Sequence, residues 1–211
     1  MPEQPLIVRE APRMRSRKLT RCGGCALYPD LCVCSSLPAL QSRTEVVVLL
    51  HRLERYKTTN TGRLAARTLA RGQSATRDRF ASIEVTPVPR SYVLFPKPDA
   101  MPLTEAIAHG IDRLIVPDGT WPQAGRLARR DPLCAGLPCV KLTCARPSRY
   151  TLRRSERPDA LCTFEAIAEA LRILEGDEIA DRMHAAFIPW LERSLVCRAG
   201  AHERRPQAPY E

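Results

Sequence analysis

Long apolar runs are missing from this 211-residue chain: the longest uncharged one, residues 46–50, is far too short to span a bilayer. The first twenty residues hold no hydrophobic segment, so we expect no secretory signal there. The ten glycines are scattered, and neither GxGxxG nor GxxxxGKS/T occurs. A membrane span and a Rossmann or P-loop nucleotide site are therefore not expected.

The composition is that of a globular protein, with 44% hydrophobic and 27% charged residues. The length allows one domain, or one domain with a small appendage, that buries a core without disulfides. The net charge is +10, and 29 of the 33 basic residues are Arg. Since guanidinium groups match phosphate oxygens, this excess points to a nucleic-acid partner. The alternative is a genome that favours Arg codons.

Nine cysteines, without an export signal, indicate a reducing compartment, and we expect the cytoplasm. Four of them follow the pattern Cys22-x2-Cys25-x6-Cys32-x-Cys34. Four thiolates at this loop spacing can close around Zn²⁺, and four protein ligands make such a site structural rather than catalytic. The alternatives are four free buried thiols, or a redox pair at Cys22 and Cys25. The other five cysteines are dispersed and are expected to be small buried hydrophobes.

Hydrophobic periodicity divides the chain into a flexible basic arm (1–20), a cysteine-rich knuckle (21–38), a main domain (39–197) and a loose tail (198–211). Short apolar runs predict strands at 44–50, 92–95, 113–117 and 140–143. Helices are predicted at 58–71, 103–109 and 121–130. Two more follow: one between an N-cap at Thr163 and a C-cap at Gly176, the other capped by Asp177. Strands that alternate with helices predict a parallel α/β sheet.

Asp118-Gly119-Thr120-Trp121 follows the predicted strand 113–117. Ligands of open α/β sheets bind at this carboxyl edge. Gly119 allows a close backbone approach, Thr120 offers a hydroxyl and Trp121 a flat stacking surface. The alternative is a strand-to-helix turn, in which Asp118 or Thr120 caps a helix and Trp121 lies in the core.

The tetrapeptide, as Asp-x-Thr-Trp, resembles the signature of the DTW-domain family. Further blocks resemble the family in the same order over residues 21–176, which a single motif cannot mimic. These blocks are RCGGC with Pro29 and CVC (21–34), LLHRLE, Lys57 and NTGRLA (49–65), LFP and Ala100 (94–100), SRYTLRR (148–154) and LCTFEA (161–166).

The resemblance implies a tRNA-uridine aminocarboxypropyltransferase. Such enzymes move the 3-amino-3-carboxypropyl group of S-adenosylmethionine to N3 of a uridine, giving acp3U, and release methylthioadenosine. It also implies a SPOUT-like parallel sheet with a C-terminal trefoil knot, in which the donor lies bent across three loops. The implied donor contacts are Leu94, Phe95, Pro96, Pro117, Asp118, Gly119, Leu161, Thr163, Phe164 and Glu165.

The implied catalytic residues are Asp118, Thr120 and Trp121. Asp118 is a candidate general base, or a group that binds the ammonium of the donor or orients the uracil. Trp121 can stack on an extruded base, since N3 of a paired uridine is inaccessible. The candidate contacts to the RNA are Arg149, Tyr150, Arg153 and Arg154.

Two other functions stay open at this point: a SPOUT-like RNA methyltransferase, and a zinc-ribbon RNA-binding adaptor without catalysis. For the protein itself the expected partner is tRNA, and no membrane partner is expected. The sequence leaves the oligomeric state open, with a monomer favoured.

Overall fold

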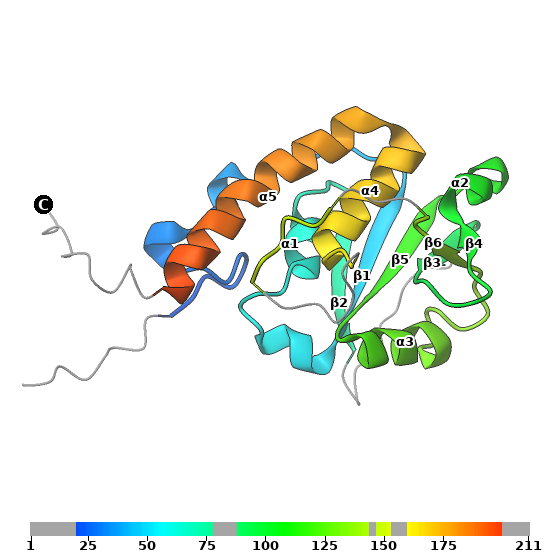
Figure 1. Ribbon diagram of the computed structural model, residues 1–211, viewed down its shortest axis with the longest axis horizontal. Coiled ribbons are helices and arrows are strands. Elements are labelled where there is room, and N and C mark those ends of the chain that lie inside the picture. The colour runs from blue at the N-terminus through cyan, green and yellow to red at the C-terminus, as the bar shows by residue number, and fades with distance from the viewer. Residues whose placement is uncertain (1–19, 78–87, 144–146, 153–159, 200–211) are drawn as a thin grey trace, which may run out of the picture.

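The computed structural model describes residues 20–77, 88–143, 147–152 and 160–199. Its centre is a six-stranded parallel sheet in the order β2-β1-β5-β3-β6-β4 (Figure 1). This confirms the predicted parallel α/β class. The strands are β1 (Glu45–His51), β2 (Gly72–Arg77), β3 (Ser91–Leu94), β4 (Met101–Pro102), β5 (Arg113–Asp118) and β6 (Cys139–Lys141).

Helices cover both faces of the sheet. Alternate residues of β1 point to opposite sides: Val46 and Val48 pack with α1, α4 and α5, whereas Val47 packs with α3. The continuous β-branched run in the sequence therefore marks a strand buried on two faces. The helices are α1 (Gly62–Arg67), α2 (Leu103–Ala106), α3 (Trp121–Arg130), α4 (Thr163–Glu175) and α5 (Asp177–Arg198), with 3-10 turns η1 (Pro29–Leu31), η2 (Cys34–Ser36), η3 (Arg52–Tyr56) and η4 (Ile107–His109).

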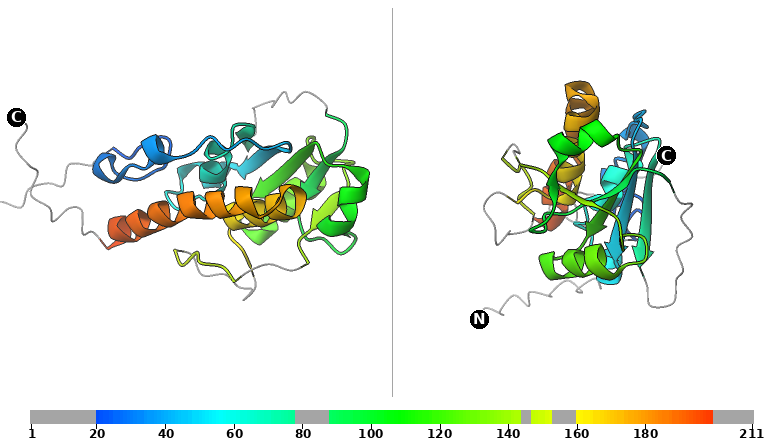
Figure 2. Two further views of the ribbon diagram at one scale, coloured as in Figure 1. Left: turned by 90° about the horizontal axis from the view of Figure 1, so that it is seen from above. Right: turned by 90° about the vertical axis from the view of Figure 1, so that its right-hand side faces the viewer.

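The cysteine-rich segment lies against the end of α5 that is remote from the sheet (Figures 1 and 2). Trp190 is fully buried there, and its Nε1 donates a hydrogen bond to the carbonyl of Cys25 over 2.9 Å. The guanidinium of Arg193 donates to the carbonyls of Leu31 and Cys32. The core of the domain therefore extends into this segment.

Most predicted elements are present, with boundaries within about two residues, but two strands were missed: β2, and β4, which has only two residues. Residues 58–71 form only a short helix, Gly62–Arg67, and β2 follows it. The β2 sequence, GQSATR, is polar because it pairs with β1 on one side and forms the edge of the sheet. It therefore lacks the hydrophobic alternation that predicts a strand.

Both caps predicted for the start of the C-terminal helices were wrong by one residue. Cys162 occupies the N-cap of α4, and Thr163 is the first helical residue. Gly176, with φ of 105°, separates α4 from α5, so Asp177 lies in the first turn of α5 instead of capping it. Within the described residues, no helix is both long and apolar enough to cross a membrane.

Candidate active site

A cavity of about 430 Å³ lies at the carboxyl edge of the sheet, where β3, β5 and β6 end. This volume is in the range of cavities that hold small molecules and cofactors. Loops that are far apart in the sequence meet here, as expected for the carboxyl ends of parallel strands. The lining includes Leu94, Phe95, Pro96, Pro117, Asp118, Gly119, Thr120, Trp121, Lys141, Leu142, Ser148, Tyr150, Leu161 and Thr163.

Asp118 is the last residue of β5 and is only 5% exposed. Its Oδ1 accepts a hydrogen bond from Thr163 Oγ1 over 2.5 Å. Its Oδ2 accepts one from Asn60 Nδ2, also over 2.5 Å. Hydrogen bonds to a carboxylate are stronger than those between neutral groups, so this pair fixes Asp118 and ties the start of α4 to the end of β5.

A second layer of polar contacts supports Asp118 through Asn60. Asn60 Nδ2 also lies 3.2 Å from Glu54 Oε2, and Asn60 Oδ1 accepts the backbone N–H of Arg63. Glu54 is fully buried, and Lys57 Nζ donates to its Oε1 over 2.5 Å. Glu54 and Asn60 were not among the site residues predicted from the sequence, although both lie in the block that resembles the DTW family.

Close packing explains why glycine follows Asp118. A Cβ on Gly119 would lie 2.9 Å from Cβ of Gln123 and 3.3 Å from Cβ of His51. The Gln123 side chain in turn accepts the backbone N–H of Thr120 over 2.9 Å, which completes the start of α3. Thr120 is therefore the N-cap residue of α3, with an exposed side chain at the rim of the cavity.

Two aromatic side chains form one wall of the cavity. Trp121 is half-buried, and its ring is tilted by 54° against Phe95, with the ring centroids 6.1 Å apart. Both residues line the cavity. Trp121 therefore does not belong to the closed core, which was the alternative left open by the sequence.

The start of α4 contributes Thr163 to the cavity, whereas the next two residues lie outside its lining. Phe164 is fully buried and stacks on Phe187 at 4.5 Å between centroids. Glu165 is 2% exposed; its oxygens accept the Ser148 hydroxyl and the backbone N–H of Arg149, both over 2.6 Å. Glu165 therefore fixes the loop that carries Tyr150, besides accepting from the N–H at the α4 cap.

The candidate RNA contacts lie in different surroundings. Tyr150 lines the cavity, and its hydroxyl donates to the carbonyl of Thr59 over 2.7 Å. Arg149 is exposed. Arg153 and Arg154 lie outside the described residues.

Lys141 is a cation of the cavity that sequence reasoning missed. It is the last residue of β6, and among the described residues no carboxylate lies within ion-pair distance of its Nζ. A single Lys at the end of a strand has no motif around it, so no sequence signal could single it out.

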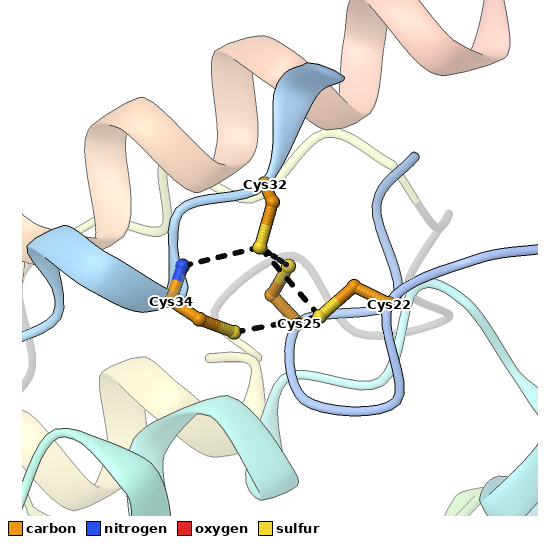
Figure 3. A group of neighbouring side chains, drawn as sticks. All are labelled: Cys22, Cys25, Cys32 and Cys34. Carbon is orange, nitrogen blue, oxygen red and sulfur yellow. Dashed lines mark hydrogen bonds between the residues drawn. The ribbon is translucent and has the colours of Figure 1, made fainter. Parts of the chain in front are cut away.

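The four cysteines of the knuckle form one cluster (Figure 3). Their Sγ atoms all lie within 4.8 Å of one another, and three pairs are 3.6 Å apart. In a tetrahedral site with Zn–S bonds of about 2.3 Å, the sulfurs lie roughly 3.8 Å apart. The cluster can therefore hold a zinc ion with little rearrangement.

The environments of these thiols differ. Backbone N–H groups of Cys25 and Gly24 lower the pKa of Cys22 to about 6. Burial raises the pKa of Cys34 to about 12, and its hydrogen bond to Cys22 adds to the effect. Cys22 is therefore the first thiolate available to a metal, and binding must displace protons from its neighbours.

A family model described as the DTW domain matches residues 19–195. The chain belongs to the DTW domain family. Three relatives of this DTW protein are named tRNA-uridine aminocarboxypropyltransferase 2, and each is 28% identical to it. They come from Drosophila melanogaster (171 residues aligned, 74% of this chain and 67% of the relative), Macaca fascicularis (179 residues, 79% and 60%) and Mus musculus (177 residues, 78% and 59%). The DTW protein thus spans about two thirds or less of the length of these relatives.

Among solved structures, the DTW protein is similar to the SAM-dependent rRNA:acp-transferase Tsr3 from Vulcanisaeta distributa. The two are 19% identical, the match covers 76% of this chain and 82% of the other, and the TM-score is 0.46.

Proposed function

We propose that this DTW protein is a tRNA-uridine aminocarboxypropyltransferase that uses S-adenosylmethionine. The observation that carries the proposal is the cavity around Asp118, in which the loops after β3 and β5 and the start of α4 meet. The family match and the names of the three relatives supply the reaction class.

In this reaction a bond forms between uridine N3 and the terminal methylene of the aminocarboxypropyl arm. The bond from that methylene to the sulfonium sulfur breaks, and methylthioadenosine leaves. The proton of N3 passes to water. Asp118 already accepts hydrogen bonds from Asn60 and Thr163, which favours a positioning and electrostatic role for its carboxylate over that of a general base.

The lining supplies groups for each part of the donor. Aromatic faces and a carboxylate both attract a sulfonium cation, and Phe95, Trp121 and Asp118 offer them. Lys141 offers a positive charge to the carboxylate of the arm. When S-adenosylmethionine is held at its sulfonium and at its carboxylate, it presents the methylene of the arm, not its methyl group, to the nucleophile. The carbon that reacts is the one aligned with the nucleophile.

Two structural features belong to this proposal. We infer a trefoil knot in the C-terminal part, supported by the meeting of the three loops; the connections at 144–146 and 153–159 lie outside the described residues. We also infer that Cys22, Cys25, Cys32 and Cys34 hold a structural Zn²⁺, which links the knuckle internally and takes no part in the chemistry.

The test is to incubate the purified protein with S-adenosylmethionine and unmodified tRNA and to analyse both products. We expect methylthioadenosine, and a uridine heavier by one aminocarboxypropyl group in nucleoside mass spectrometry. S-adenosylhomocysteine would indicate a methyltransferase instead. RNA binding with neither product would indicate the adaptor.

The variant Asp118→Ala is expected to abolish the modified uridine. Asp99→Ala is the matched control, because its carboxylate is 74% exposed and lies outside the cavity lining. Circular dichroism of both variants separates loss of the site from loss of the fold. Full activity of a folded Asp118→Ala protein would contradict the assignment of the site.

A further inference from the structure

The turn η3 follows β1 directly and carries basic and aromatic side chains at the same end of the sheet as the cavity (Figure 1, cyan, beside α3 in green). Arg52 and Arg55 are exposed, and Tyr56 is 72% exposed. The Arg55 guanidinium lies 4.8 Å from the centre of the Tyr56 ring and donates to its hydroxyl over 2.8 Å. Arg55 thus orients the Tyr56 ring, most of which stays exposed to solvent.

Helix α3 adds a further cation to this surface. Gln123 and Arg126 are three residues apart on α3 and therefore share a face. Gln123 packs on Gly119 next to His51, the residue from which η3 starts. Burial lowers the pKa of His51, and the positive charges of Arg52 and Arg126 add to this effect. Arg52 on η3 and Arg126 on α3 therefore both lie near His51.

The positive charge of this surface is not neutralised within the described residues. No carboxylate there lies within ion-pair distance of Arg52, Arg55, Arg63 or Arg126. Arg63 belongs to α1 and reaches the carbonyl of Arg55 over 3.5 Å. The nearby acid, Glu54, is buried and binds Lys57 and Asn60 instead. We call Arg52, Arg55, Tyr56, Arg63 and Arg126 the η3 surface.

The η3 surface is connected to the cavity by hydrogen bonds. Glu54 comes from η3, and it contacts the Asn60 amide that also holds Asp118. The backbone N–H of Arg63 donates to the oxygen of the same Asn60 amide. An RNA strand bound to η3 would therefore lie next to the hydrogen-bonded residues that hold Asp118 in place.

We propose that the η3 surface binds the single-stranded RNA segment next to the target uridine. This inference rests on the proposed function and adds a second RNA contact area to the Arg149 loop. Arginines contact the phosphates, and Tyr56 offers a platform on which a neighbouring base stacks. Basic residues interleaved with an exposed aromatic ring are typical of surfaces that bind single-stranded nucleic acid. An acidic peptide would interact with the arginines but would not stack on the Tyr56 ring.

The test measures tRNA affinity over a series of salt concentrations for R52A, R126A and Y56A. Each lost phosphate contact is expected to reduce the slope of log K against log salt by about 0.7–0.9. Loss of a stacked base is expected to weaken binding by roughly tenfold, with little change in slope. The matched control is R182A, since Arg182 is 61% exposed on α5 and does not line the cavity.

Binding of S-adenosylmethionine to each variant serves as the measure of an intact site and should equal that of the wild type. Unchanged tRNA affinity and slope in all three η3 variants would overturn the proposal, as would polyglutamate that competes as well as RNA for the wild type. If the wild type binds tRNA but never forms methylthioadenosine, the proposed function fails. In that case, the tRNA affinities of the η3 variants relative to that of R182A still test whether the η3 surface binds RNA.

Discussion

The hydrogen bond from Thr163 to Asp118 gives the sharpest test of the site, because one substitution removes it without changing volume. In Thr163→Val, a methyl group replaces the hydroxyl that donates to Asp118 Oδ1 over 2.5 Å. The carboxylate is 5% exposed, so water reaches its oxygens poorly. We expect the variant to fold, but Asp118 Oδ1 then lacks the hydrogen bond that the hydroxyl of Thr163 donates.

The cost follows from the charge of the acceptor. A hydrogen bond to a charged group contributes about 1.5–3 kcal/mol, and we take roughly 2 kcal/mol because Thr163 itself is half-buried. For a chain of this size, about 1 kcal/mol corresponds to roughly 2–4 °C in Tm. The expected loss is therefore about 4–8 °C, measured by thermal unfolding without ligand.

Two control variants isolate the hydrogen bond. Thr163→Ser keeps the hydroxyl and is expected to lose much less stability. Thr104→Val makes the same change at an exposed position of α2 and should leave Tm nearly unchanged. If Thr163→Val matched the wild type in Tm, the bond would contribute nothing to stability, and the reasoning about the Asp118 network would be refuted.

Three further predictions concern the metal, the donor and pH. Cys34→Ser is expected to lose bound zinc, measured by mass spectrometry of the metal, and to lower Tm, because the ion links the knuckle that packs on α5. Lys141→Met is expected to raise KM for S-adenosylmethionine by roughly tenfold through loss of a charged contact. Burial and Arg52 lower the pKa of His51 from 6.5, so the unfolded chain takes up the proton first as pH falls. The wild type should therefore lose stability relative to His51→Gln below pH 6.5.

Each of these has a matched comparison. Cys197→Ser removes a half-buried thiol outside the cluster and should keep zinc. Lys97→Met removes a cation that pairs with Asp99 outside the cavity lining, so KM should not change. Retained zinc in Cys34→Ser, equal KM values for the two lysine variants, or parallel pH curves for the wild type and His51→Gln would each contradict the corresponding argument.

Local patterns in the sequence determined much of this protein. The buried runs that became β1 and β5 were recognisable, because a central parallel strand needs apolar side chains on both faces. Four cysteines within residues 22–34 can approach one another through a short loop, so their spacing alone predicted a cluster. The position of Asp118 at the end of a buried strand also followed from the sequence, since carboxyl ends of parallel strands meet at one edge.

Only the tertiary structure decided what surrounds Asp118. Its partners Asn60 and Thr163 lie 58 and 45 residues away in the sequence, and no local pattern encodes such contacts. The same holds for Glu165, whose carboxylate fixes a loop instead of facing the cavity, and for Lys141, which gains its place from the pairing of β6. Hydrophobic periodicity reports which face of an element is buried, whereas the partner of a polar group depends on the positions of distant chain segments.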